Sequence, residues 1–208
     1  MLGDVHTRPK SQALFDKIRA DILEGQFAPG HWLKLLDLER RYGARRSEVR
    51  SALSSLSERG IVEYSKNRGF SVFQRSPEEV RELTEIIVAL EATAAPSIVE
   101  RATPQDIEAL EALAREFDAL TEHVNHAQLR LKNYQFHGQL NSLAANALLG
   151  KTVRTLRECS VLGPFNRYAS YQGLKESSRE HFALLDALRR KDVPTFSRIL
   201  HDHASHVD

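Results

Sequence analysis

The sequence predicts a mainly α-helical chain: an N-terminal winged helix-turn-helix followed by an all-α antiparallel helical bundle. Apolar residues recur at helical spacing along most of its 208 residues, and strand-like alternation is confined to residues 61–73. Residues 1–75 carry 14 Lys and Arg against 9 Asp and Glu, whereas residues 76–208 carry 15 against 19. The net charge of +1 therefore hides a basic first part and an acidic second part.

The two parts are expected to be separate domains, residues 1–75 and 76–208. The boundary falls at Arg75-Ser76-Pro77, where a strand gives way to a Ser-Pro-Glu-Glu helix start. No apolar run approaches the roughly 20 residues of a membrane span, and the N-terminus lacks a signal-peptide core. The single cysteine, Cys159, allows no internal disulfide. We expect a cytoplasmic protein without a membrane partner.

Three helices are predicted in the first domain, the third of them over residues 46–59. The first two are marked by two apolar patterns: Leu14, Ile18 and Ile22, then Leu35, Leu38 and Tyr42. Residues Val49, Ala52, Leu53 and Leu56 define the buried face of the third helix. Arg46 and Arg50 lie one turn apart on its other face. A helix with arginines at its start has the shape that enters a major groove and contacts base edges.

A hairpin is predicted directly after this helix. Residues 61–64 and 70–73 alternate like strands, and Asn67-Arg68-Gly69 forms the turn between them. The hairpin would be a wing, with Arg68 placed to reach the DNA backbone or the minor groove. Arginines on short helices are commonly just solvated, but the complete order of elements favours double-stranded DNA as the partner. The basic first domain would also gain free energy from counterion release.

The second domain is predicted to contain six helices in an antiparallel bundle. They start near residues 77, 103, 126, 147, 173 and 193. Four polar residues fall on the apolar faces of three of these helices: Asn133, His137, His181 and His203. Asn133 and His137 are four residues apart, on one side of a helix.

These four side chains form a candidate site for a divalent transition metal, with Zn²⁺ or Ni²⁺ as the best candidates. Three imidazoles and an amide oxygen can hold such an ion and leave a position open for water or a ligand. Each residue alone is better explained as a hydrogen-bonded core residue. Three histidines converging from three helices are harder to explain in that way. Four other histidines of the second domain are predicted to lie at the surface: His123, His126, His201 and His206.

Several motifs resemble the GntR family of bacterial transcription regulators, in the FadR-like branch with an all-helical effector-binding (FCD) domain. In the first domain the similar stretches are residues 27–30, 43–53 and 67–69. In the second domain Phe136-His137, Glu180-His181 and His203 match the metal-binding histidines of the family. The resemblance covers most of residues 11–205.

The resemblance implies a ligand-responsive regulator that binds a palindromic operator as a homodimer. A small-molecule effector, a carboxylate or sugar acid, would bind near the metal in the helical domain. The candidate DNA-binding residues are Arg45, Arg46, Ser47, Arg50, Asn67, Arg68 and Gly69.

The chain also departs from the family pattern. Arg45 stands where a small helix-capping residue is usual and Glu48 replaces a common Pro, so either Ser47 caps the helix or Arg45 adds a phosphate contact. Leu35 and Leu36 occupy a segment that is usually polar and often carries a further DNA contact, which leaves the operator sequence open.

Two departures concern the effector domain. Asn133 replaces the usual metal-binding Asp, and its neutral amide should lower metal affinity. Ile87 stands where an arginine frequently faces the cavity, so a carboxylate effector lacks an expected partner.

An enzymatic function is the alternative: a metal-dependent enzyme with an accessory nucleic-acid module, since an open histidine site can activate water. Such an enzyme needs a carboxylate beside the metal as general base. Glu180 is the one nearby candidate in the sequence, and it precedes His181 by one residue, which turns it about 100° away on a helix. We therefore expect the chain not to be an enzyme.

Overall fold

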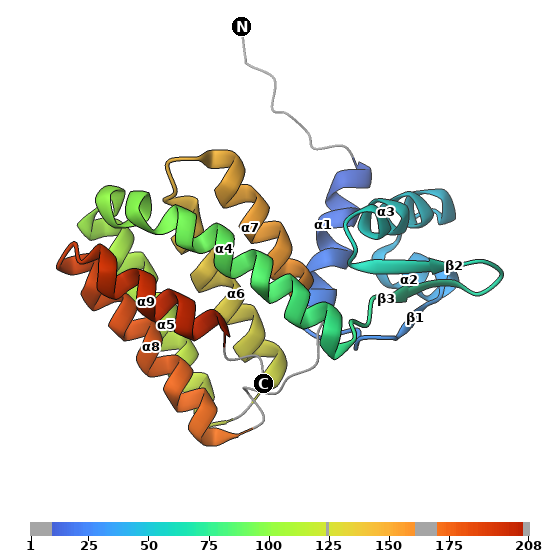
Figure 1. Ribbon diagram of the computed structural model, residues 1–208. Coiled ribbons are helices and arrows are strands. Elements are labelled where there is room, and N and C mark those ends of the chain that lie inside the picture. The colour runs from blue at the N-terminus through green and yellow to red at the C-terminus, as the bar shows by residue number, and fades with distance from the viewer. Residues whose placement is uncertain (1–9, 124, 161–169, 206–208) are drawn as a thin grey trace, which may run out of the picture. The chain divides into compact units, whose positions relative to one another are not determined.

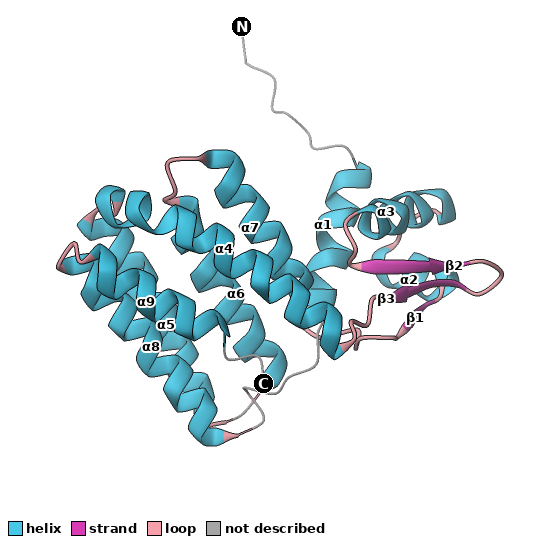
Figure 2. Ribbon diagram, in the orientation of Figure 1, coloured by secondary structure: helices cyan, strands magenta, loops and turns pink. Residues whose placement is uncertain are grey.

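A computed structural model describes residues 10–123, 125–160 and 170–205 of the chain (Figure 1). The chain forms two compact units, Met1–Gln74 and Arg75–Asp208, which we call the head and the body. Helices build both units, whereas the strands among the described residues lie in the head (Figure 2). The expected mainly α-helical class, with a winged helix-turn-helix before a helical bundle, is confirmed.

The head contains three helices and a small antiparallel sheet. Its elements in chain order are α1 (Lys10–Leu23), β1 (Trp32–Leu33), α2 (Leu35–Tyr42), α3 (Arg46–Glu58), β2 (Val62–Ser65) and β3 (Gly69–Val72). The strand order is β1-β3-β2. The sequence did not predict β1, because a strand of two residues cannot show an alternating pattern.

The head core lies between α1, α3 and the sheet. Ile18, Val49 and Leu53 are fully buried there. At the edge of this core Tyr42 donates a 2.6 Å hydrogen bond to Asp21 of α1, which ties α2 to α1. Burial, together with this carboxylate, raises the pKa of the Tyr42 hydroxyl. These contacts give α3 a firm support.

The start of α3 differs from one of the two sequence-based expectations. Gly43 adopts a left-handed backbone with φ of 61°, which allows the tight turn from α2 into α3. Arg45 is the N-cap residue, and its backbone N–H donates to the Glu48 carboxylate at 2.7 Å. Ser47 is the second residue of the helix and does not cap it. Glu48, in place of the common Pro, therefore satisfies a donor at the helix start.

The described part of the body contains the six predicted helices. They are α4 (Pro77–Arg101), α5 (Pro104–Thr121), α6 (His126–Ser142), α7 (Ala147–Ser160), α8 (Tyr171–Arg189) and α9 (Val193–Ser205). Ser76 caps α4 and Thr103 caps α5, each accepting from the backbone N–H three residues later. Hydrogen bonds from Thr103 also lower the pKa of Asp106. Within the described ranges, no helix is long and apolar enough to cross a bilayer.

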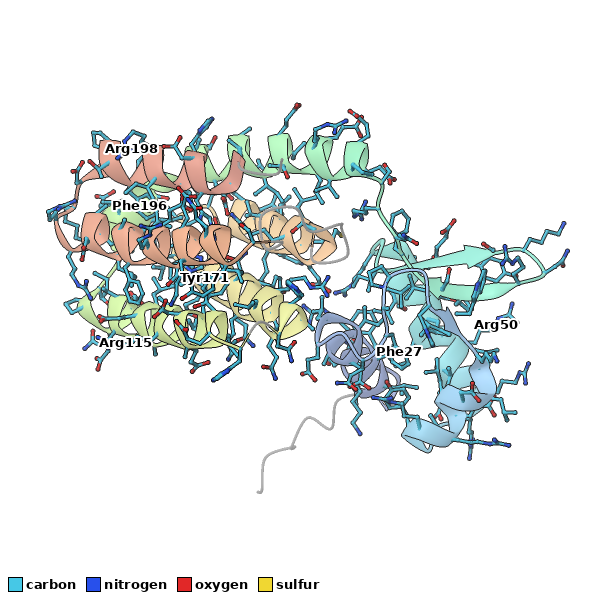
Figure 3. The ribbon with its side chains drawn as sticks, turned by 90° about the horizontal axis from the view of Figure 1, so that it is seen from below. Phe27, Arg50, Arg115, Tyr171, Phe196 and Arg198 are labelled. Carbon is cyan, nitrogen blue, oxygen red and sulfur yellow. The ribbon has the colours of Figure 1, made fainter. Side chains whose placement is uncertain are left out.

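The core of the body lies between its helices and is rich in Leu, Ile, Phe and Ala. Phe136, Leu184 and Phe196 are among its fully buried side chains. In Figure 3, Phe196 points between helices, whereas Arg115 and Arg198 point outward. Gly150 lets α7 approach α6 closely, because a Cβ at this position would lie 2.4 Å from the carbonyl oxygen of Asn141.

Candidate functional site

The exposed face of α3 presents the arginines predicted to contact DNA. Arg46 and Arg50 are both exposed and one turn apart. The Arg46 side chain is 71% exposed, and its guanidinium lies 3.9 Å from the Glu39 carboxylate, a weak surface contact. Arg45 and Ser47 are exposed at the same end of the helix. Four of the predicted DNA contacts therefore share one helix terminus.

A shallow hollow of about 350 Å³ continues this face between α3 and the hairpin. Its lining residues are Arg50, Ser54, Ser57, Glu58, Tyr64 and Phe70. Of these, Arg50 can be located in the head in Figure 3. Sequence reasoning missed Ser54 and Tyr64. Ser54 lies one turn after Arg50 and was detectable from its spacing, whereas the place of Tyr64 depends on how the hairpin packs.

The Asn-Arg-Gly motif forms the turn of the wing. Asn67 and Gly69 have φ of 67° and 96°, so both shape the left-handed backbone of the turn. The backbone N–H of Arg68 donates to the Ser65 carbonyl oxygen at 3.1 Å. The Arg68 side chain is exposed, and its guanidinium lies over the ring of Trp32.

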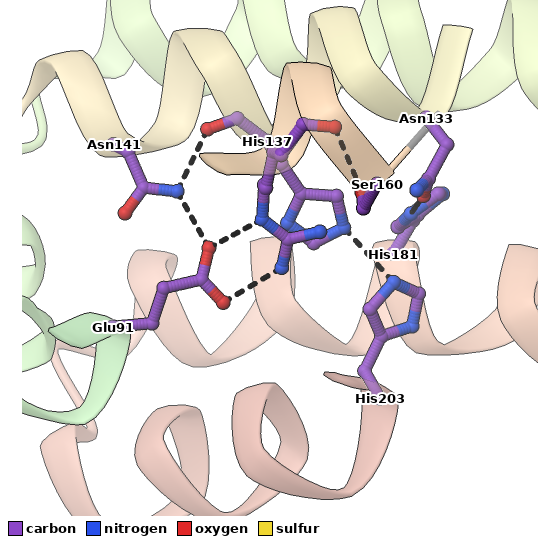
Figure 4. A network of polar contacts seen from close by, with 8 residues as sticks. Glu91, Asn133, His137, Asn141, Ser160, His181 and His203 are labelled. Atoms are coloured by element: carbon purple, nitrogen blue, oxygen red, sulfur yellow. Dashed lines mark hydrogen bonds and ion pairs between the residues drawn. The ribbon is translucent and has the colours of Figure 1, made fainter. Parts of the chain in front are cut away.

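In the body, the structure brings together the four residues predicted to bind metal (Figure 4). His137 of α6, His181 of α8 and His203 of α9 are buried, and their ligand atoms lie within 4.8 Å of one another. The Nε2 atoms of His137 and His203 are 2.9 Å apart. The Nε2 atom of His181 lies 3.0 Å from Oδ1 of Asn133, which is half-buried.

This donor set fits a divalent transition metal. Nitrogen ligands around a tetrahedral zinc ion, at about 2.0–2.1 Å from it, lie about 3.3–3.5 Å from one another. The separations in the cluster, from 2.9 Å up to 4.8 Å, span this value, so small side-chain rotations would suffice. Imidazole nitrogens also suit zinc, nickel and copper better than they suit magnesium or calcium.

The surroundings of the cluster fix two of its rings. The ring centroids of Phe136 and Phe117 lie 4.3 and 4.9 Å from that of His181. The Glu180 carboxylate accepts a 2.7 Å hydrogen bond from Nδ1 of His203, which leaves Nε2 of that ring facing the cluster. Glu180 of α8 therefore orients a histidine of α9. Sequence reasoning considered it only beside His181, because contacts between helices are not visible in the spacing.

A buried ion pair lies beside the histidine cluster and was also missed (Figure 4). The Glu91 carboxylate accepts from Nε and Nη2 of Arg157 at 2.6 and 2.7 Å. Asn141 donates through Nδ2 to Glu91 at 2.8 Å and to the His137 carbonyl oxygen at 2.9 Å. The pair thus connects α4 and α7 to the helix that carries His137. The sequence indication for this pair was Glu91, a charged residue among the buried apolar residues of α4.

Other positions considered from the sequence do not join the cluster. Ile87 is buried against Leu83, Val153 and Cys159, so this position carries no charge toward a ligand. Burial raises the pKa of the Cys159 thiol, which favours a packing role. The histidines predicted at the surface are exposed where described, at His123, His126 and His201, and His206 lies outside the described residues.

Comparison with known families matches both units. Residues 10–72 match the gntR family of bacterial regulatory proteins, and residues 82–206 match the FCD domain. The chain belongs to the GntR family, in the branch with an FCD domain. It is a DNA-binding transcription regulator, and neither family is one of enzymes, so the metal-dependent enzyme considered from sequence is not supported.

Relatives with a similar length support this assignment. The regulator BphR of Paraburkholderia xenovorans is 27% identical over 209 residues, covering 95% of this chain and 83% of its own. The Nta operon transcriptional regulator of Aminobacter aminovorans is 28% identical, covering 88% and 85%. The structure of E. coli McbR/YncC has a TM-score of 0.81 at 20% identity, covering 93% of this chain and 92% of its own, which shows the shared fold.

Proposed function

We propose that this GntR-family protein is a ligand-responsive regulator that binds a palindromic operator as a homodimer. In this proposal α3 enters the major groove with Arg46 and Arg50 toward base edges. Arg45, Ser47 and the wing Arg68 contact the backbone, and Asn67 and Gly69 shape the wing. A regulator of bacterial DNA works in the cytoplasm, as the sequence predicts.

The convergence of His137, His181 and His203 in the body is the observation that carries the ligand-responsive part. The ligand atoms of these three buried imidazoles lie within 4.8 Å of one another, which is compact enough for one ion. We infer that a divalent transition metal, zinc or nickel, binds here, held by the three histidines with Asn133 as a weak fourth ligand. Such an ion would supply positive charge and an open coordination position.

A small carboxylate or sugar acid is the effector that we propose, because the metal would supply the positive charge that such an anion needs. Ile87 offers no charge, and the Arg157 guanidinium is already paired with Glu91. The effector's carboxylate would therefore be recognised at the histidine cluster itself, with His203 held in orientation by Glu180. Hydroxyl groups of a sugar acid could hydrogen-bond to polar side chains such as Asn133.

A homodimer is supported by the geometry of DNA reading and by exposed apolar side chains. One winged helix covers only a few base pairs, so useful specificity needs two heads on one operator. In the body, Ile86 of α4 is 52% exposed and Leu148 of α7 is 73% exposed, and a second copy of the chain would cover such side chains. Light scattering should give about twice 23.6 kDa at micromolar concentration. A monomeric mass would contradict this part.

The regulator is tested by selecting a duplex from a random DNA library with the full-length protein. Binding to that duplex is then titrated with small carboxylates and sugar acids, with and without zinc. An effector should change the affinity and raise the melting temperature only when the metal is present. Failure to enrich any duplex would reject specific DNA binding. A response that ignores the metal would separate the effector from the histidine cluster.

The metal is tested by elemental analysis after refolding with excess zinc and dialysis. The protein should retain close to one equivalent, and His181→Ala should lose it, because two imidazoles and an amide make a poor site. His201→Ala is the matched control, since His201 is an exposed histidine of α9 outside the cluster. Equal retention by both variants, or none by the unmodified protein, would reject the site.

A further inference from the structure

Trp32, the single tryptophan of the chain, lies on the sheet face opposite the head core. Its neighbour Leu33 is buried and pairs with the buried Phe70, whereas Trp32 pairs with Ser71 of β3. Because successive side chains of a strand point to opposite faces, the indole stands on the outer face, where it is only partly buried. Core packing therefore does not explain this large aromatic residue.

The indole instead supports the wing arginine. The Arg68 guanidinium carbon lies 4.5 Å from the centroid of the Trp32 ring, a cation–π distance. Among the described residues, none forms an ion pair with Arg68. Arg41 of α2 is a contrast, because its guanidinium is paired with the Asp21 carboxylate at 2.8 Å. The charge of Arg68 is thus held in place without being neutralised.

Stacking of this kind leaves the guanidinium ready to bind an anion. The ring face attracts the positive charge, while the N–H groups around the guanidinium edge stay available as donors. A long side chain that is ordered before binding loses less conformational entropy when the complex forms. The left-handed turn at Asn67 and Gly69 sets the backbone, and the indole sets the side chain.

We propose that Trp32 is a positioning residue for DNA binding, which holds Arg68 so that its edge N–H groups donate to a backbone phosphate. The proposal rests on the DNA-binding mode proposed for the head. It assigns a role to Trp32 that the sequence pattern did not indicate. It also separates two contributions of the wing: Arg68 supplies the charge, and Trp32 supplies the order.

Salt dependence of DNA binding distinguishes these contributions. Two probes are used, the duplex selected by the full-length protein and a scrambled duplex of the same composition at low salt. Arg68→Ala should lower the slope of log affinity against log salt by about 1, because one phosphate contact is lost. Trp32→Leu should weaken binding to both duplexes by about two- to fivefold with the slope unchanged. Trp32→Phe should keep most of the affinity, because a ring face remains.

A double variant and tryptophan fluorescence complete the test. Trp32→Leu combined with Arg68→Ala should bind no more weakly than Arg68→Ala alone. Additive losses, or unchanged binding by Trp32→Leu, would overturn the proposal. In the free protein Arg68→Ala should shift Trp32 emission to the red, and an unshifted spectrum would also overturn it, independently of the folding of Trp32→Leu. Failure to select a duplex would count against specific operator binding only, since the scrambled probe still compares the variants.

Discussion

The head keeps its functional polar side chains exposed, whereas the body buries its own. Among the described residues of the head, Ser71 is the one buried polar side chain, and the arginines of α3 and the wing are exposed. The body buries charged and hydrogen-bonding groups in its core, including Glu91, Arg157 and His181. An exposed guanidinium suits a large polyanion, whereas buried groups suit a small ligand that must be enclosed.

This difference has an energetic consequence. Exposed charges of the head cost little to keep solvated, so their substitution should change DNA binding and leave folding almost intact. Buried polar groups of the body depend on one another for hydrogen bonds, so their substitution should affect folding, metal binding or both. The following experiments test this division, beginning with the largest expected effect.

Breaking the buried ion pair should cause the largest loss of stability. Glu91→Ala leaves the Arg157 guanidinium buried without its carboxylate, which should lower the free energy of unfolding by about 3–5 kcal/mol. Guanidinium chloride unfolding, followed by far-UV circular dichroism, measures the change. Glu91→Leu combined with Arg157→Met should recover much of the loss, because an apolar pair needs no hydrogen bonds.

Glu111 is the surface control for that experiment. It is paired with Arg115 and Arg189 at the exterior of the body, and these guanidinium groups lower the pKa of its carboxyl. Glu111→Ala should hardly change the unfolding midpoint. Comparable losses in Glu91→Ala and Glu111→Ala would show that the buried network is not special.

In the head, substitutions of α3 should act on binding and spare stability. Arg46→Ala or Arg50→Ala should each weaken binding to the selected duplex by about 1–3 kcal/mol, because each removes a base-edge or charged backbone contact. Gel-shift titrations at fixed salt measure this loss. Arg115→Ala removes the same charge from an exposed site of the body and should leave affinity nearly unchanged. Unaltered binding by both α3 variants would rule out this docking mode.

Glu180 tests whether the metal site depends on contacts between helices. Glu180→Ala should weaken metal affinity by about 10–100-fold, because Nδ1 of His203 loses the acceptor that orients the ring. Glu180→Gln keeps a neutral acceptor and should lose less. Glu176→Ala, an exposed carboxylate one turn earlier on α8, is the control. Competition with a chelating dye gives the affinities, and equal affinity in all three variants would remove Glu180 from the site.

The smallest expected change comes from restoring a carboxylate to the site. Asn133→Asp should tighten metal binding by about tenfold, because a charged ligand compensates the ion better than an amide does. The same dye competition measures it. If no metal is retained and Asn133→Asp behaves like the unmodified protein, the pocket is a plain polar cavity in which the histidines bind the effector directly.

The sequence by itself determined the features that depend on neighbours along the chain. Helix stripes such as Leu14, Ile18 and Ile22 predicted buried faces, because three- and four-residue spacing is set by the helix itself. The wing turn followed from Asn67 and Gly69, whose types favour left-handed backbone. The three cluster histidines were identified as inward-facing for the same local reason.

Only the tertiary structure decided which of these side chains meet. Glu180 contacts His203, Glu91 pairs with Arg157, and the Trp32 ring lies under the Arg68 guanidinium. The two residues of each pair are 23 to 66 positions apart in the sequence. Such contacts depend on the rotation and separation of whole elements, for example on the close approach of α7 to α6 that Gly150 permits. Local periodicity fixes the face on which a residue lies, and the packing of elements fixes its partner.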